Sequence, residues 1–423
     1  MNPFCPKLEH LDRRSFLKGT LVGTGGAVFA NWGGLFNSTA SAQETTRRQK
    51  RCILLWMNGG ASHLDTFDMK PNRPTGGPFR PINTNVNGIR ICEYLPTLAN
   101  HMDKIAVIRS MRTQSVDHPG GIYQMHTCYR QNDNLPHPEI GAMVARYLGN
   151  PGADLPSFVR MGPTGNAGSG YLGPQYAPFS VGRDGRLPSF ARSGVTPESD
   201  PRQTELLRFV EQQFQQTHQA EPFAAHQEAR ERTWRLMRAR ETFNIDQEWP
   251  RFRDLYGDTE FGKRCMLARK LVEAGVPFVE AGQDNYDSHA DNFAVHKGNL
   301  RVLDKAWTGL LTDLGQRGLL EDTLVVWMGE IGRTPRINNR AGRDHYVRAW
   351  SVALAGCGIR GGIAYGTTDR DGATVSENPV SEGDLFATIY TALGVNPRVR
   401  HHIGTRPIWA TPEGSGPVQA IMS

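Results

Sequence analysis

Short apolar runs alternate along this chain with segments of helical periodicity. Five continuous apolar runs predict strands that are buried on both faces, and they lie at 53–57, 105–108, 276–280, 323–328 and 350–355. Apolar positions at helical spacing predict helices, and these lie at 139–148, 261–274, 292–315 and 383–393. This alternation predicts an α/β fold, a doubly wound and mostly parallel sheet with helices on both faces.

Two long segments interrupt the alternation. Residues 151–190 are dense in Gly and Pro with scattered aromatic side chains, which predicts an ordered loop excursion. Residues 201–247 are rich in Gln, Glu, Arg and Ala, which predicts a mostly solvated helical segment. We therefore expect one domain over residues 43–423, with an insertion at about 151–250.

The first 42 residues have the features of an export signal. Arg13 and Arg14 are followed by Phe-Leu-Lys, then by a weakly apolar stretch at 19–36 and a small-residue end at Ala40-Ser-Ala42. This combination predicts a twin-arginine signal peptide over residues 1–42. The implied partner is the twin-arginine export machinery, and the implied location is periplasmic or extracellular.

Composition excludes several other classes of protein. The 423 residues carry a net charge of +6, and no long basic run follows the signal, so nucleic-acid binding is not expected. No later apolar run reaches the roughly 18 residues that span a bilayer, so no transmembrane span is expected. The remaining cysteines lack CxxC spacing, which favours buried free thiols over a zinc cluster, although one disulfide stays open. They are Cys52, Cys92, Cys128, Cys265 and Cys357.

Polar residues that could bind a cation follow three of the predicted strands. Asp287 and His289 follow the run at 276–280, with Asp284 as a competing carboxylate. Glu330 follows the run at 323–328, and Asp65 follows the first run. Because the carboxyl ends of parallel strands meet at one rim of a sheet, we expect these side chains to converge.

Asp344 and His345 add a carboxylate and an imidazole shortly before the last predicted strand. Carboxylates and imidazoles together suit a divalent cation, so the sequence predicts a hydrolytic metal site. Mixed ligation favours zinc or manganese, while calcium and magnesium stay open. The predicted metal ligands are Asp65, Asp287, His289, Glu330, Asp344 and His345.

Four motifs in this order resemble the bacterial family catalogued as domain of unknown function 1501. They are Asn58-Gly-Gly-Ala-Ser-His-Leu-Asp65-Thr-Phe-Asp68, Asp287-Ser-His289, Gly329-Glu-Ile-Gly-Arg-Thr-Pro335 and Gly342-Arg-Asp-His345. That family is grouped with the alkaline phosphatase and sulfatase superfamily. The resemblance implies a doubly wound α/β fold and hydrolysis of phosphate or sulfate esters at one or two metals. It also implies that Asp287, His289 and His345 match superfamily metal ligands.

The chain also departs from the superfamily pattern. Ile331 follows Glu330 where the superfamily has an Asp-His pair, and His118 stands where a Ser, Thr or Cys nucleophile is expected. A bound cation could activate water without a protein nucleophile, with His118 as general acid or leaving-group stabiliser. Arg333 and Arg343 are expected to bind phosphate or sulfate oxygens through their guanidinium forks.

Each candidate also has a purely structural interpretation. The arginines could form ordinary surface ion pairs, His118 could be satisfied by backbone hydrogen bonds, and Asp65 could pin a turn. Asp287 and His289 could cap the helix that begins near residue 292.

Two hypotheses of function follow. The first is an exported metal-dependent hydrolase that acts on small-molecule or polysaccharide esters of phosphate or sulfate. The second is a non-catalytic exported protein on the same scaffold, in which the segment at 151–190 binds a glycan or a protein.

Overall fold

The apolar run that opens the described chain forms the middle of a large sheet. The computed structural model describes residues 49–132, 134–165, 167–182, 235 and 238–423. Nine strands form the sheet in the order β12-β4-β11-β8-β1-β7-β5-β6, with β15 beside β4. They are β1 (Arg51–Met57), β4 (Ile105–Arg112), β5 (Phe158–Met161), β6 (Phe179–Val181), β7 (Phe278–Gln283), β8 (Thr323–Met328), β11 (Trp350–Gly356), β12 (Ile363–Tyr365) and β15 (Val380–Ser381).

Every neighbouring pair in this sheet is parallel except the two pairs that involve β11. β11 runs antiparallel to both β4 and β8. The mostly parallel sheet is therefore confirmed. Because β11 runs the other way, its first residue lies at the rim where β1, β4, β7 and β8 end.

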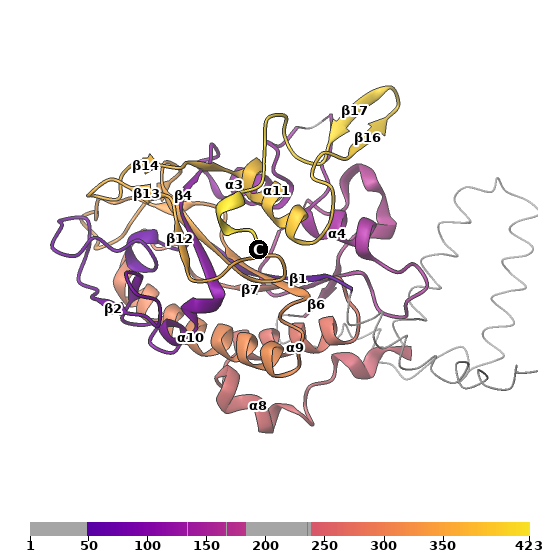
Figure 1. Cartoon of the computed structure of the whole chain (residues 1–423), viewed down its shortest axis with the longest axis horizontal. Coiled ribbons are helices and arrows are strands. Elements are labelled where there is room, and N and C mark those ends of the chain that lie inside the picture. Colours follow the sequence, from indigo (N-terminus) through magenta and orange to yellow (C-terminus); the bar gives the residue numbers. More distant parts are fainter. Residues whose placement is uncertain (1–48, 133, 166, 183–234, 236–237) are drawn as a thin grey trace, which may run out of the picture. The chain divides into compact units, whose positions relative to one another are not determined.

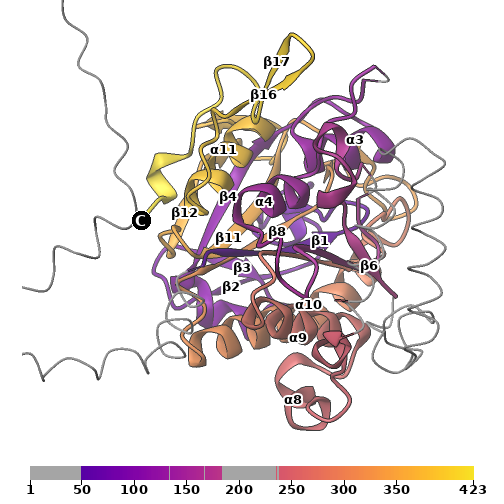
Figure 2. The same cartoon turned by 90° about the vertical axis from the view of Figure 1, so that its right-hand side faces the viewer.

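Helices cover both faces of the sheet, as the alternation predicted (Figures 1 and 2). Successive residues of β1 alternate between two apolar cores: Ile53 and Leu55 enter one, Leu54 and Trp56 the other. The first core contains residues of α8 (Trp249–Tyr256), α9 (Glu260–Glu273) and α10 (Asn292–Gln316). The second contains residues of α3 (His118–Thr127), α4 (Ile140–Leu148) and α11 (Glu382–Ala392). The fold is therefore doubly wound.

Small elements complete the described chain. Four two-stranded sheets pair β2 (Pro81–Asn83) with β3 (Arg90–Cys92), β9 (Gly332–Arg333) with β10 (His345–Tyr346), β13 (Thr367–Thr368) with β14 (Val375–Glu377), and β16 (Arg400–Ile403) with β17 (Arg406–Trp409). Short 3₁₀ helices lie at His63–Asp65, Leu98–Lys104, Gly170–Leu172, Pro174–Tyr176, Arg240–Phe243 and Gln419–Ile421.

The five predicted strands and four predicted helices all form, within a few residues of their expected ends. The prediction of a loop excursion at 151–190 was wrong in part, because β5 and β6 lie inside it and extend the sheet. Both strands are very short and are flanked by Gly and Pro, so their apolar pattern was too brief to register. The predicted signal at 1–42, and most of the predicted helical segment at 201–247, lie outside the described residues.

The five cysteines of the described chain are all buried free thiols, as predicted, and they are Cys52, Cys92, Cys128, Cys265 and Cys357. Within the described ranges, no helix is both long enough and apolar enough to cross a bilayer.

Candidate metal centre

Loops at one rim of the sheet carry the candidate residues. β7 leads to Asp287 and His289, and β8 leads to Glu330. β4 leads to α3, whose first residue is His118. His345 lies in β10, a few residues before β11 begins. Because β11 is antiparallel, its entry shares the rim with the exits of the parallel strands.

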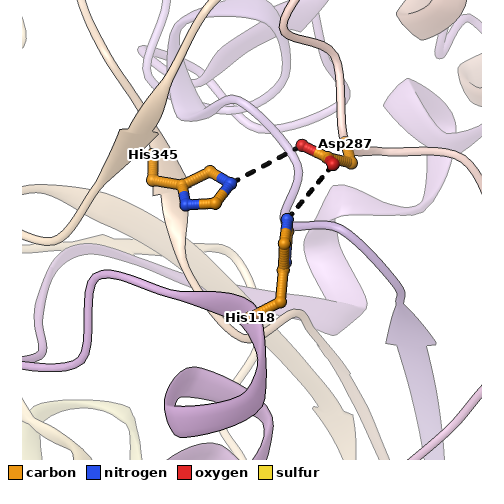
Figure 3. A group of neighbouring side chains, drawn as sticks. All are labelled: His118, Asp287 and His345. Atoms are coloured by element: carbon orange, nitrogen blue, oxygen red, sulfur yellow. Dashed lines mark ion pairs between the residues drawn. The ribbon is translucent and has the colours of Figure 1, made fainter.

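Three of these side chains point toward one another (Figure 3). His118, Asp287 and His345 each offer a ligand atom, and these atoms lie within 4.8 Å of one another. His118 Nε2 is 3.3 Å from Asp287 Oδ2, and His345 Nε2 is 3.6 Å from Asp287 Oδ1. Among the described residues, this group has the spacing that one metal ion requires.

His289 extends the group on its outer side. Its Nε2 atom lies 3.2 Å from Asp287 Oδ1 and 3.0 Å from His345 Nε2. Three imidazole Nε2 atoms therefore face the single carboxylate of Asp287. We call His118, Asp287, His289 and His345 the imidazole cluster.

The other nitrogen of each imidazole is held by an oxygen. Nδ1 of His118 lies 2.8 Å from Glu330 Oε1, and Nδ1 of His289 lies 2.7 Å from Asp344 Oδ1. Nδ1 of His345 lies 2.8 Å from the carbonyl oxygen of Val116. Carboxylate and carbonyl oxygens only accept hydrogen bonds, so each Nδ1 carries the hydrogen.

In a neutral ring, this tautomer leaves the Nε2 lone pair free to bind a cation. Metal-binding histidines have this arrangement, with Nδ1–H donated to a carboxylate or a backbone carbonyl. Glu330 and Asp344 therefore orient the rings of His118 and His289 through their Nδ1 atoms. The Nε2 atoms of these rings point toward Asp287.

Local charges shift the titration of these groups. The hydrogen bond to Glu330 raises the pKa of His118. Burial lowers the pKa of His345. Burial by itself would raise the pKa of Asp287, but the hydrogen bond and charge of Arg333 outweigh it and hold the pKa below its ordinary value. Asp287 is therefore an anion at neutral pH.

Gly59 ties two of the loops together. Its φ of 106° is in the left-handed region, and a Cβ atom there would lie 2.2 Å from the backbone nitrogen of Asp287. The Gly59 amide donates to Glu330 Oε1 at 2.8 Å, and Arg333 donates to the Gly59 carbonyl. Only glycine permits this approach of the loop after β1 to the loop after β7.

The chain matches the family model described as "Protein of unknown function (DUF1501)" over residues 49–422. It belongs to this family. No curated protein sequence matches it significantly.

Several solved structures resemble the fold at low identity. A sulfatase, PsFucS1, from Pseudoalteromonas sp. is 14% identical, with coverage of 84% of this chain and 70% of that chain and a TM-score of 0.40. The lipoteichoic acid synthase LtaP from Listeria monocytogenes is 10% identical, with coverage of 84% and 78% and a TM-score of 0.35. A phosphonate monoester hydrolase of Agrobacterium radiobacter is 13% identical, with coverage of 83% and 75% and a TM-score of 0.30.

Arg333 has an inward position in this DUF1501 protein. It is fully buried, and its guanidinium donates to Asp287 Oδ1 at 2.8 Å, to the Gly60 carbonyl at 3.1 Å and to the Arg343 carbonyl at 3.2 Å. The sequence predicted that Arg333 binds a substrate anion. The structure instead directs this guanidinium at Asp287, because the pairing of β9 with β10 turns the side chain inward.

Asp65 and Arg343 form a separate, fully buried ion pair. Arg343 Nε lies 2.8 Å from Asp65 Oδ2, and Asn292 also donates to Asp65 at 2.9 Å. Arg343 further donates to the backbone carbonyls of Thr75 and Pro335. The predicted ligand Asp65 and the predicted anion-binding Arg343 therefore contact each other and lie outside the imidazole cluster.

The backbone groups of Val116 and Gly59 were not identified from the sequence. Backbone carbonyls and amides leave no signal in residue type, although a Gly-Gly pair such as 59–60 is of the kind that permits close backbone approach. Asp284, the competing carboxylate, does not join the cluster, and Asn58 donates to it at 3.3 Å.

The donor set fits a divalent cation. Two buried side-chain atoms that make no hydrogen bond in the described structure, His118 Nε2 and Glu330 Oε2, lie at this site. Two imidazole nitrogens with one carboxylate, those of His118, His345 and Asp287, suit zinc or manganese better than calcium or magnesium, which prefer oxygen ligands.

Proposed function

We propose that this DUF1501 protein is an exported metal-dependent hydrolase of phosphate or sulfate esters. The observation that carries the proposal is the convergence of three imidazole Nε2 atoms on Asp287, with every Nδ1 held by an oxygen. Such fixed tautomers are characteristic of metal-binding histidines. We propose zinc or manganese as the ion, and a small molecule or a polysaccharide as the carrier of the ester.

We assign the residues of the site by their contacts. The imidazole cluster would hold the ion, and Glu330 and Asp344 would orient its rings. When bound, a divalent cation supplies Lewis-acid polarisation of the ester and activation of water. Arg333 keeps Asp287 ionised through their hydrogen bond.

Two exposed arginines are candidates for the substrate anion. Arg336 and Arg340 lie on the loop between β9 and β10, and both are open to solvent, unlike Arg333 and Arg343. A guanidinium in that position can pair with phosphate or sulfate oxygens through two parallel hydrogen bonds. We propose that this loop binds the anionic end of the ester.

The location of the protein follows from the proposed signal at 1–42. Twin-arginine export carries proteins that have already folded, so a metal could be bound before secretion. We expect a double Arg13→Lys, Arg14→Lys variant to stay in the cytoplasmic fraction, whereas the wild type is found in the periplasm or the medium. Equal distribution of both proteins would rule out this route.

A combined metal and activity assay tests the function. Protein purified from the native export route is assayed for metal content and for hydrolysis of aryl phosphates and aryl sulfates. We expect stoichiometric metal and turnover in the wild type, and loss of both in His345→Ala. The exposed His402→Ala variant is the matched control and should behave as the wild type.

The alternative hypothesis makes the opposite expectation. A protein without stoichiometric metal, and with wild type and His345→Ala equally inactive on both ester classes, would be a binding protein on this scaffold.

A further inference from the structure

The β16–β17 hairpin projects from the body of the protein (Figures 1 and 2). In the described structure its two strands pair with each other, from Arg400 with Trp409 to Ile403 with Arg406. Its base is anchored, where Tyr129 donates to the Trp409 carbonyl at 2.8 Å, Ile408 is buried and His401 contacts Tyr147 and Tyr171, while residues 402–407 are exposed. The outer part of the hairpin is therefore open to a partner.

This hairpin lies in a stretch of the chain that carries basic side chains and no acidic ones. Residues 385–412 contain no Asp or Glu but include Arg398, Arg400, His401, His402 and Arg406. Burial lowers the pKa of His401, and the positive charges of Arg146 and His402 lower it further. His401 is therefore neutral at pH 7, and the positive charge of this region comes from the arginines of the hairpin and from Arg146.

Aromatic rings lie among these basic groups. Arg400 places its guanidinium carbon 4.1 Å above the centre of the Trp409 ring. Arg146, on α4, lies over the Tyr176 ring and donates to the Tyr176 hydroxyl at 2.7 Å. These ring contacts restrain the guanidinium groups at the surface, which lowers the entropy lost when they bind an anion.

Tyr147 joins the hairpin to α4. Its hydroxyl lies 3.2 Å from His401 Nε2, and its side chain is 37% exposed, so part of the ring stays open. We call this set of residues the basic aromatic surface. It consists of Arg146, Tyr147 and Tyr176 with the exposed part of the hairpin, which carries Arg400, His402 and Trp409 on one face and His401 and Arg406 on the other.

The basic aromatic surface is distinct from the metal centre. Gln49, which precedes β1, donates to the carbonyl of Leu148 at the end of α4. The surface therefore lies toward the edge where the parallel strands begin, whereas the imidazole cluster lies where they end.

We propose that the basic aromatic surface binds a linear anionic polysaccharide that carries sulfate or phosphate groups. Guanidinium groups pair with such anions in a bidentate manner, and exposed tyrosine offers the apolar face that sugar rings cover. A lipid surface fits less well, because the exposed large apolar side chains of this region are limited to Tyr147 and Ile403. This binding goes beyond the proposed hydrolysis, since it requires no metal.

Binding to dextran sulfate, with unsulfated dextran of equal length as the neutral probe, tests the proposal. We expect the full-length protein to bind dextran sulfate only. The double variant Arg400→Gln, Arg406→Gln should bind about tenfold more weakly. The double variant Arg90→Gln, Arg251→Gln removes the same charge from exposed positions elsewhere and should bind as the wild type.

A second variant keeps the charge and tests the aromatic contribution. Tyr147→Ala should weaken binding to dextran sulfate about threefold while leaving the salt dependence unchanged. Circular dichroism and thermal melting of each variant establish that it is folded.

Three results would overturn the proposal. They are equal affinity in the hairpin and control variants, no binding of dextran sulfate by the wild type, or hairpin-dependent binding of anionic phospholipid vesicles or duplex DNA in place of dextran sulfate. Because binding is measured with a chelator present and requires no metal, a failure of the aryl-ester assay leaves this test unaffected.

Discussion

At the scale of single residues, Glu330 is tightly held at the candidate metal centre. Its side chain is 1% exposed, and Oε1 accepts hydrogen bonds from both the Gly59 amide and His118 Nδ1. Glu330→Gln keeps the shape but removes the charge that orients His118. We expect the apparent affinity for zinc to fall about 10- to 100-fold, as measured by competition with a chromophoric chelator.

Glu377→Gln is the matched control for this variant, because Glu377 is exposed at the end of β14. It should bind zinc as the wild type does. Unchanged affinity in Glu330→Gln would contradict the orienting role that we assign to this carboxylate.

The buried pair of Asp65 and Arg343 gives a second prediction at this scale. Arg343→Met leaves Asp65 as an uncompensated buried anion, so we expect the free energy of unfolding to fall by about 3–5 kcal/mol. Adding Asp65→Asn should restore much of that loss, because it removes the stranded charge. Urea unfolding of both variants measures the two values.

The same pair separates a structural role from a ligand role for Asp65. Asp65→Asn should leave the metal content of the folded protein unchanged. If this variant loses its metal while its unfolding free energy stays that of the wild type, Asp65 acts as a ligand and the structural assignment is wrong.

At the scale of elements, α3 connects the imidazole cluster to a buried charge network. His118 begins the helix, and His126 in its last turn lies 2.9 Å from Glu280 on β7. Arg160 on β5 lies 3.4 Å from Glu280 and also pairs with Glu139. This network fixes α3 to the sheet two turns below the imidazole cluster.

The network predicts a pH dependence of stability. Burial would lower the pKa of His126, but Glu280, with a smaller effect of Glu139, outweighs burial and raises it. A raised folded-state pKa stabilises the fold below the unfolded value of about 6.5, and the effect is lost as pH rises through the folded value. Between pH 6 and 9 we therefore expect the slope of the unfolding free energy against pH to be less negative in His126→Gln than in the wild type, because the variant lacks this loss.

Urea unfolding across that pH range measures both slopes. His402→Gln is the control, because His402 is exposed on β16, and its slope should match the wild type. Identical slopes in wild type and His126→Gln would show that His126 does not titrate in this range.

Long apolar runs allowed most elements to be predicted from sequence. β8 and β11 are each buried along nearly their whole length, so their patterns were clear. The direction of β11 could not be predicted, because an interior strand is equally apolar whether it is parallel or antiparallel. β5 and β6 were too short for a pattern, and their place at the sheet edge depends on contacts with β7.

Part of the candidate site could also be predicted from the sequence. The positions of Asp287, His289 and Glu330 after strands follow from chain order, and chain order is visible in the sequence. The inward turn of Arg333 and the pairing of Asp65 with Arg343 depend on three-dimensional packing. Residue type alone does not distinguish a guanidinium that faces solvent from one that is buried against a carboxylate.

At the scale of the whole molecule, a bound ion would hold together loops that lie far apart in the sequence. Ligands that bind only the folded state add stability, about 2.7 kcal/mol at a free concentration of 100 times Kd. We expect zinc to raise the melting temperature of metal-free wild-type protein and a chelator to reverse the rise, with no response in His345→Ala. Equal melting temperatures with zinc and with chelator in the wild type would argue against an ion at this site.

The place of β4 in the sheet has a consequence for synthesis of the protein. β4 is made early, yet its neighbours β11, β12 and β15 all come from the last quarter of the chain. A nascent chain therefore holds β4 without a neighbouring strand until the last quarter of the chain is made. Such non-local pairing slows folding. Ribosomes that stall or terminate before β11 would release a chain with an unprotected strand, a ready target for proteases and for aggregation.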